Sequence, residues 1–366
     1  MEKLVSIIMP AYNCADYIAE SIRSVQNQSY RNWELIVADD NSTDGTVDAV
    51  RSVAADDNRI HLLETDINLG PAAARNRAIN AAQGDYIAFL DSDDIWYPDK
   101  LSRQISFMEQ MGYDFTYTAY EKINERGEHM GVVISAPKSV NYSSMLYQGD
   151  PIGNLTVVYN AEKLGKFYVP DIKKRNDFAL WLKIMHDCER AYGLDEVLAS
   201  YRVRSGSISS TRKSELLKYY WKLYHDIEKL SNVKASAAMV TLVFFKSIRQ
   251  TDQRMQRVRN NFGAKQIIGS PTDIEKSSED TAKAVNDLEN ITFRRTKEKN
   301  ISATADNSND AEYAQKEEEL LKLLFLYTRK SRVCGLSTTP AELRLRQRQQ
   351  MLKCAVEKTI NNSFFT

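Results

Sequence analysis

The sequence predicts an α/β fold built on a parallel, doubly wound sheet, and three observations lead to this class. Four short apolar runs near the start of the chain have the length of buried strands. Segments with helical spacing separate these runs, so strands and helices alternate. A polar loop follows each run, as expected where ligands bind at the carboxyl ends of parallel strands.

The predicted strands are apolar on both faces, which favours positions inside a parallel sheet. They cover Leu4–Met9, Trp33–Ala38, Ile60–Leu63 and Tyr86–Leu90. The helices predicted between them are amphipathic or rich in small residues that can pack closely on a sheet. They cover Ala15–Gln28, Thr46–Ala54 and Ala72–Ala82.

The pattern changes from Tyr113 onward, where strands follow each other across turns. The predicted elements are strands at Phe115–Tyr120, Gly131–Ser135, Thr156–Tyr159 and Tyr192–Arg202, and an apolar helix at Phe178–Met185.

Composition indicates a globular protein of two or three domains, given 366 residues of which 43% are apolar. Lysine plus arginine and aspartate plus glutamate both number 49, so charge gives no argument for nucleic acid as a partner. The four cysteines form no CxxC pair, which fits a reducing compartment. No signal peptide and no run of about 18 apolar residues is evident, so we expect a cytoplasmic protein.

An acidic turn, Asp91-Ser92-Asp93-Asp94, directly follows the last of the buried strands. Crowded carboxylates raise each other's pKa unless a cation compensates them. Mg²⁺ and Mn²⁺ prefer such oxygen ligands and often share them with a phosphate. The alternative is a solvated turn that caps the helix beginning near Pro98. The turn by itself leaves both interpretations open.

Five segments of residues 1–212 resemble the inverting glycosyltransferases of family 2, which have the GT-A fold. The segments are Val5–Asn13, Ile36–Thr46, Asn68–Asn76, Gly84–Asp94 and Asn176–Leu182. Each motif is weak alone, but their joint order and spacing make the resemblance specific. It implies a mostly parallel twisted sheet with flanking helices, followed by a mainly helical C-terminal region.

The resemblance implies a UDP-sugar site and the residues that form it. They are Pro10, Tyr12, Asp40, Arg75, Asp91, Ser92 and Asp93. Tyr12 can stack on the pyrimidine, and Asp40 can accept its ring N–H. Asp93 would bind Mn²⁺ or Mg²⁺ directly, with support from Asp91. For the neighbouring Asp94, a helix cap is favoured over a sugar contact.

Asp177 resembles the family's general base, in a motif usually written Glu-Asp. Asn176 stands in place of the usual acid. Asp177 would take the acceptor hydroxyl proton during a single inverting displacement, although it could also cap the following helix. Arg202 and Arg204 resemble a late segment that often carries histidine, and we assign them to the diphosphate because arginine can pair with phosphate bidentately.

The chain divides into a catalytic domain and a C-terminal part that is predicted to be helical. Within the catalytic domain we assign 1–112 to a nucleotide-binding half and 113–212 to an acceptor half. Residues 213–250 form a helical extension. Its segment Ala235–Ile248 could lie at a membrane surface or pack on the catalytic domain. The tail, 251–366, has polar linkers and amphipathic helices that could form an oligomer face, and it carries no catalytic signal.

These inferences combine into one expected function. We expect metal-dependent, inverting transfer of a hexose or N-acetylhexosamine from a UDP-sugar to a glycan or lipid-linked acceptor. The setting would be cell-surface polysaccharide synthesis, with peripheral contact to the cytoplasmic face of the membrane. Two alternatives are a degenerate nucleotide-sugar-binding scaffold and a nucleotidyltransferase. The latter usually needs a phosphate loop rich in glycine and lysine, which Pro10–Asn13 does not provide.

Overall fold

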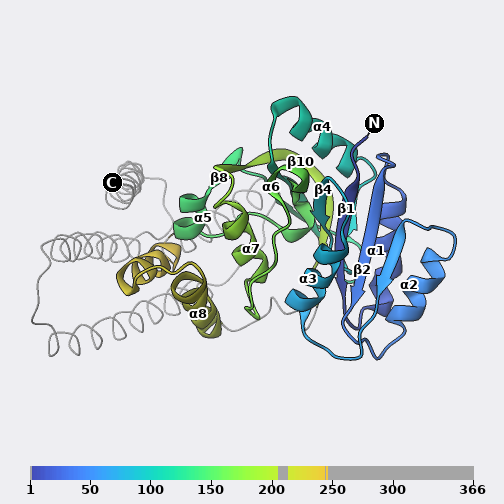
Figure 1. The fold of residues 1–366 in the computed structure, drawn as a ribbon, viewed down its shortest axis with the longest axis horizontal. Coiled ribbons are helices and arrows are strands. Elements are labelled where there is room, and N and C mark those ends of the chain that lie inside the picture. Colours follow the sequence, from blue (N-terminus) through green and yellow to red (C-terminus); the bar gives the residue numbers. More distant parts are fainter. Residues whose placement is uncertain (1, 205–212, 244, 246–366) are drawn as a thin grey trace, which may run out of the picture. The chain divides into compact units, whose positions relative to one another are not determined.

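The computed structural model describes residues 2–204, 213–243 and 245. The first of two compact units runs from Met1 to Leu242 and contains all the predicted site residues. Figure 1 shows a central sheet with helices packed along it. The predicted tail, 251–366, and the oligomer face assigned to it lie outside the described residues.

The first half, residues 1–112, alternates strands and helices as predicted, and its strands pair in parallel in the order β3-β2-β1-β4. Every residue of β1 and β2 is buried, which explains why these strands are apolar on both faces. The elements are β1 (Val5–Ala11), α1 (Ala15–Gln26), β2 (Trp33–Asp39), α2 (Thr46–Ala54), β3 (Ile60–Leu63), α3 (Pro71–Ala81) and β4 (Tyr86–Phe89).

The second half extends the same sheet in the order β9-β6-β10-β5. β9 is antiparallel to both β4 and β6, whereas β6 and β10 are parallel. The elements are β5 (Ile95–Trp96), α4 (Lys100–Met111), β6 (Phe115–Ile123), β7 (His129–Ile134), β8 (Ser139–Asn141), α5 (Tyr142–Gln148), β9 (Val158–Asn160), α6 (Ala161–Leu164), α7 (Asn176–Ile184) and β10 (Arg190–Arg202). The short elements β5, β8, α5 and α6 were not predicted.

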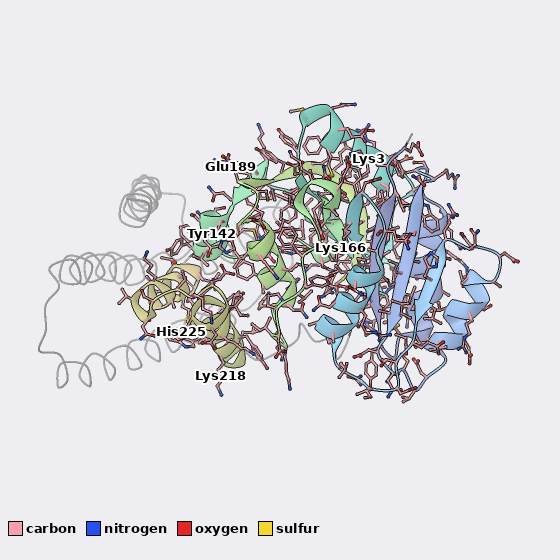
Figure 2. The ribbon with its side chains drawn as sticks, viewed as in Figure 1. Lys3, Tyr142, Lys166, Glu189, Lys218 and His225 are labelled. Carbon is pink, nitrogen blue, oxygen red and sulfur yellow. The ribbon has the colours of Figure 1, made fainter. Side chains whose placement is uncertain are left out.

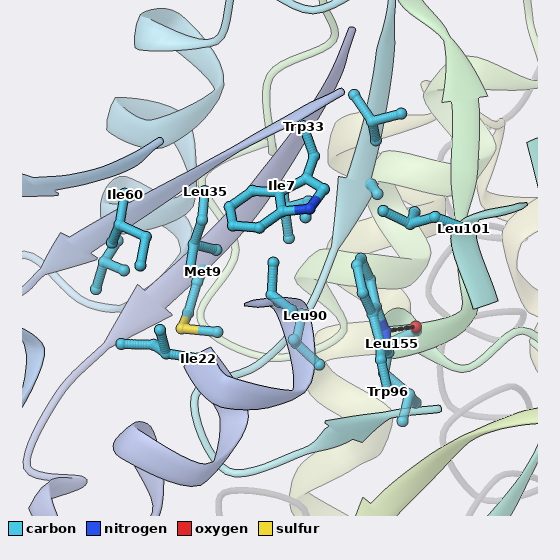
Figure 3. Packing of buried hydrophobic residues seen from close by; sticks show 14 of the residues in the cluster. Ile7, Met9, Ile22, Trp33, Leu35, Ile60, Leu90, Trp96, Leu101 and Leu155 are labelled. Atoms are coloured by element: carbon cyan, nitrogen blue, oxygen red, sulfur yellow. Dashed lines mark hydrogen bonds between the residues drawn. The ribbon is translucent and has the colours of Figure 1, made fainter. Parts of the chain in front are cut away.

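The core between α1 and the sheet joins the two halves (Figure 3). Ile7, Leu35 and Leu101 are fully buried within it. The Trp96 indole N–H donates to the Leu155 carbonyl at 2.7 Å, so its polar atom is satisfied inside the core. This hydrogen bond ties the segment after the acidic turn to the segment that leads into β9.

Further helices follow the sheet. They are α8 (Lys213–Trp221), the π-helix η3 (Lys222–Ile227) and a helix over residues 232–243. Tyr220 of α8 lies 6.2 Å from the Phe178 ring of α7, and the Tyr142 hydroxyl of α5 donates to Glu228, which follows η3, at 2.6 Å. Figures 1 and 2 show α8 beside α7 and Tyr142 near these helices. The segment after residue 212 is therefore attached to the helix that carries Asp177.

The apolar stretch predicted at Ala235–Ile248 is described only in part. Ala235 and Ala238 are fully buried, and Leu242 is 2% exposed. This burial favours packing within the protein, one of the two alternatives left open, over an exposed membrane-facing stripe. Within the described ranges, no helix is both long enough and apolar enough to span a bilayer.

Candidate active site

The loops after β1 and β2 hold each other in place at the carboxyl edge of the sheet. Asn13 has a left-handed backbone (φ 45°), a conformation that asparagine tolerates better than most residues. Its side-chain oxygen accepts from the Thr43 N–H at 2.9 Å, and its own N–H donates to Ser42 Oγ at 3.0 Å. Tyr12, just before it, is 50% exposed, so its ring is available to a ligand.

Asp40 connects this pair of loops to α3. Its carboxylate accepts from the N–H groups of Leu69 at 2.9 Å and Gly70 at 2.6 Å, while its own N–H donates to the Ala11 carbonyl. Gly70 has φ 89°, a conformation that favours glycine. Both carboxylate oxygens thus hold the loop that begins α3, and a nucleobase N–H would have to use their remaining lone pairs.

Pro10 and Ser92 take structural positions around this site. Pro10 is buried in β1 beside Ala38. Burial raises the pKa of the Cys14 thiol, and hydrogen bonds with Ser92 and Thr46 oppose that rise. Ser92 is 8% exposed, so little of this residue is open to a ligand.

The acidic turn folds back on itself after β4, where the Asp94 N–H donates to the Asp91 carbonyl at 3.1 Å. The Asp91 and Asp93 side chains are 34% and 17% exposed. Burial, with a smaller effect of Asp91, raises the pKa of Asp93. Burial also raises the pKa of Asp94 well above its usual value, followed by repulsion from Asp93 and Asp91. The turn therefore concentrates negative charge that favours a cationic partner.

Two arginines supply positive charge to the turn. Arg75 Nη2 donates to Asp91 Oδ1 at 2.9 Å, and Arg204 Nε lies 2.6 Å from Asp93 Oδ2. No cluster of three or more His, Cys, Asp or Glu side chains suited to a metal ion occurs in the part of the chain that the structure describes. Two carboxylates completed by phosphate oxygens and water nevertheless fit Mg²⁺ or Mn²⁺. To bind such a cation, Asp93 would have to share its carboxylate between the cation and Arg204.

Arg202 is 2% exposed, and its guanidinium is surrounded by protein oxygens. Nε donates to the Asp93 carbonyl at 2.8 Å, Nη1 to the Glu125 carbonyl at 3.1 Å, and Nη2 to Glu20 Oε2 at 2.6 Å. Its backbone N–H donates to Asp94 Oδ1 at 2.9 Å. These contacts hold the acidic turn and leave the guanidinium little access to a diphosphate, contrary to the expected phosphate role.

The expectation that Asp94 caps the following helix is wrong. That helix, α4, begins at Lys100 with Asp99 at its N-cap position. Asp94 instead accepts the Arg202 backbone N–H and is 1% exposed. Because this partner lies far along the chain, local spacing around Pro98 could not reveal it.

Asp177 lies in the first turn of α7, behind Arg175, which has a left-handed backbone (φ 63°). Asp177 Oδ1 accepts from the Phe178 N–H at 2.8 Å, so the carboxylate is oriented by its own helix. The side-chain oxygen of Asn176 accepts from Arg75 Nη1 at 3.2 Å. Three hydrogen bonds therefore connect Asp177 to Asp91, through Asn176 and Arg75.

This arrangement can be compared with known proteins. The protein-family model described as "Glycosyl transferase family 2" matches residues 6–165 of this chain. A Bacillus subtilis protein named as a teichuronic acid biosynthesis glycosyltransferase, TuaG, is 42% identical over 237 residues, which are 65% of this chain and 93% of TuaG. The chain belongs to glycosyltransferase family 2. The family resemblance inferred from the five motifs is thereby confirmed.

A second relative of this family 2 glycosyltransferase is Escherichia coli WfgD, named UDP-Glc:alpha-D-GlcNAc-diphosphoundecaprenol beta-1,3-glucosyltransferase. It is 42% identical over 224 residues, covering 61% of this chain and 86% of WfgD. The crystal structure of S. aureus TarS 1-349 in complex with UDP-GlcNAc matches with a TM-score of 0.52 at 23% identity, covering 67% of this chain and 71% of that one. This likeness supports the fold, and the α/β GT-A prediction is confirmed.

The structure brings most of the predicted residues of this glycosyltransferase to one edge of its sheet. Asp40 connects to α3, Arg75 of α3 to Asp91, and Arg204 to Asp93. Leu69 lies within the predicted Asn68–Asn76 motif, and its backbone N–H donates to the Asp40 carboxylate, a contact that the sequence did not predict. Asp177 lies beyond the matched residues 6–165, so its role rests on its position and on the motif.

Proposed function

We propose that this enzyme transfers a hexose or N-acetylhexosamine from a UDP-sugar, with inversion, to a glycan or lipid-linked acceptor in cell-surface polysaccharide synthesis. Mg²⁺ or Mn²⁺ would assist the reaction. The names of TuaG and WfgD support the pathway and the substrate classes, since the chain covers 93% and 86% of these relatives. A glycan or lipid-linked acceptor is also the reason to keep peripheral membrane contact within the proposal.

The observation that carries the proposal is the convergence of three kinds of group at one sheet edge. An exposed aromatic ring, Tyr12, stands beside the Asp40 loop. The acidic turn lies at the end of β4, between Arg75 and Arg204. Asp177 joins the same network through Asn176. Sugar transfer requires a nucleoside site, compensation for a leaving diphosphate, and a base, and these groups can supply all three.

On the donor side, Tyr12 would stack on the uracil ring and Asp40 would accept its N–H with a free lone pair. Arg204 would move from Asp93 toward the diphosphate, where its planar guanidinium can bind two oxygens. Asp91 and Asp93 would hold the divalent cation, which supplies Lewis-acid stabilisation of the charge on the departing diphosphate. Ser92 would set the spacing between these two carboxylates from behind.

On the acceptor side, Asp177 would accept the proton of the attacking hydroxyl. The hydroxyl oxygen forms a bond to the anomeric carbon as the bond from that carbon to the diphosphate oxygen breaks, and UDP departs. One displacement inverts the anomeric centre, so no covalent enzyme intermediate is needed. A positioned base contributes about 10²–10⁴-fold in rate.

The test is donor turnover by the purified protein across a panel of nucleotide sugars, with Mn²⁺ and after chelation. We expect metal-dependent release of UDP from one UDP-sugar, increased by a diphosphate-lipid acceptor carrying a sugar. Asp177→Ala should lose this turnover yet still bind UDP. Failure of every nucleotide to bind would contradict the proposal, and UDP binding without turnover on any acceptor would favour the scaffold alternative.

A further inference from the structure

Arg75 is a buried cation that bridges two segments far apart in the sequence. It extends from α3, is 4% exposed, and donates through Nη2 to Asp91 at 2.9 Å and through Nη1 to Asn176 Oδ1 at 3.2 Å. A buried guanidinium requires partners for its donors, because each unsatisfied donor retains its desolvation cost. Asn176 and Asp91 accept from Nη1 and Nη2, whereas Nε is buried without a partner among the described residues.

Asn176 is also fixed to the residue that follows it. The Asp177 backbone N–H donates to Asn176 Oδ1 at 2.7 Å. One oxygen atom thus accepts both from Arg75 and from the peptide that carries the proposed base. Since Asn176 is the first residue of α7, this oxygen links the start of the helix to the acidic turn.

We propose that Asn176 is a positioning residue that fixes Asp177 relative to the acidic turn through Arg75. The proposal rests on the function proposed above, since that function gives Asp177 and Asp91 their roles. The path is continuous: the Asp91 carboxylate binds Arg75, Arg75 binds the Asn176 oxygen, and that oxygen binds the Asp177 peptide. The amide touches no reacting atom and acts through its two neighbours.

A neutral amide suits this bridge electrostatically. Arg75 has one positive charge, and its paired carboxylate is Asp91. An acid at position 176 would place a second carboxylate on the same guanidinium and beside Asp177. The amide oxygen accepts the same two hydrogen bonds and adds no charge next to the base. Asn176 departs from the Glu-Asp pattern of the family motif that this segment resembles. As a neutral bridge between Arg75 and the Asp177 peptide, it therefore has a function in this chain.

Removal of the amide should misplace the base and leave the nucleotide site intact. A displacement of about 1 Å can lower turnover by about 10²-fold when reacting groups must be aligned. We expect Asn176→Ala to lower kcat by about 10- to 100-fold, with the donor KM and UDP affinity within about twofold of wild type. Asn176→Asp keeps an acceptor oxygen for both donors but adds a second carboxylate, so its kcat should lie between those of Asn176→Ala and wild type.

Asn160→Ala is the matched control. Asn160 also holds a helix start through its side-chain oxygen, which accepts from the Lys163 N–H at 3.1 Å, but it precedes α6 rather than α7. Asn160→Ala should lower the melting temperature about as much as Asn176→Ala does, while its kcat stays at the wild-type value. A kcat loss in Asn160→Ala equal to that of Asn176→Ala would assign the effect to general stability and overturn the proposal.

The experiment measures kcat, donor KM and UDP affinity for these variants, for Asp177→Ala and for Arg75→Lys with and without Asn176→Ala. Arg75 and Asn176 act through the same bridge, so the kcat of the double variant should fall by less than the product of the two single-variant fold-losses. A wild-type kcat for Asn176→Ala, or equal losses in kcat and UDP affinity, would overturn the positioning role. If Asp177→Ala stays active, the proposed function itself fails; if Asp177→Ala is inactive and Asn176→Ala is normal, the failure belongs to this inference alone.

Discussion

Replacing Arg202 with methionine should destabilise the catalytic unit through the loss of buried hydrogen bonds rather than a surface ion pair. Methionine retains most of the aliphatic length and removes the guanidinium. The Asp93 and Glu125 carbonyls then lose donors at 2.8 and 3.1 Å, and Glu20 loses its 2.6 Å contact. The cation over the Tyr17 ring, 5.1 Å from the centroid, is lost as well.

The magnitude follows from the exposure of each partner. Hydrogen bonds from a charged donor are worth about 1.5–3 kcal/mol each, so the two carbonyls account for about 3 kcal/mol at the lower end. The Glu20 side chain is 54% exposed and can be solvated by water, so its ion pair adds less than about 1 kcal/mol. The Tyr17 contact adds about 0.5–1 kcal/mol. We expect a total loss of about 4 kcal/mol in the free energy of unfolding.

Urea unfolding followed by tryptophan fluorescence measures this loss, and Glu20→Gln is the control for the ion pair alone. We expect Glu20→Gln to cost less than about 1 kcal/mol. A loss below about 1 kcal/mol for Arg202→Met would refute the assignment of Arg202 as the support of the acidic turn. A Glu20→Gln loss equal to that of Arg202→Met would show that the ion pair, not the carbonyl contacts, dominates.

Three further predictions concern other parts of the unit. Burial lowers the pKa of Lys100 well below its usual value, so the unfolded state binds more protons than the folded state and the folded state loses stability as pH falls from about 10. Lys100→Met should therefore have a higher melting temperature than wild type at pH 7, and the difference should shrink near pH 10. Equal melting temperatures at pH 7 would contradict this prediction. Glu228→Ala should cost about 1–3 kcal/mol in urea unfolding because it removes the acceptor shared by Tyr142 and His186, and Glu228→Gln should cost less. Asp40→Asn leaves one backbone N–H of the loop before α3 without an acceptor. Because this loop and Asp40 are assigned to the nucleoside site, calorimetry should show a UDP affinity about tenfold weaker than that of wild type. An unchanged affinity would remove Asp40 from the nucleoside site.

Local pattern was sufficient to predict the first half of the fold. Runs such as Trp33–Ala38 are apolar on both faces because both faces of β2 are covered, and the spacing in the sequence records this directly. The helix at Thr46–Ala54 has the predicted bounds. Short elements were missed because a strand as brief as Ile95–Trp96 has no periodicity of its own and exists through pairing with β10.

The site could be predicted as a set of residues but not as a network. Motif order identified Arg75, Asp91 and Asp177 as members. Their connection runs through Asn176, 101 residues after Arg75, and no local spacing reveals such a contact. The same limit applies to Asp94 and Arg202, 108 residues apart, where the sequence suggested a helix cap and a phosphate ligand. Long-range partners determined which polar groups are available to a ligand.

The most direct test of the central claim is the anomeric configuration of the product made from an α-linked UDP-sugar, determined by NMR for wild type and Asp177→Ala. Direct displacement with Asp177 as base predicts a β-linked product from wild type and no detectable product from Asp177→Ala. An α-linked product, or a β-linked product formed at the wild-type rate by Asp177→Ala, would contradict the account.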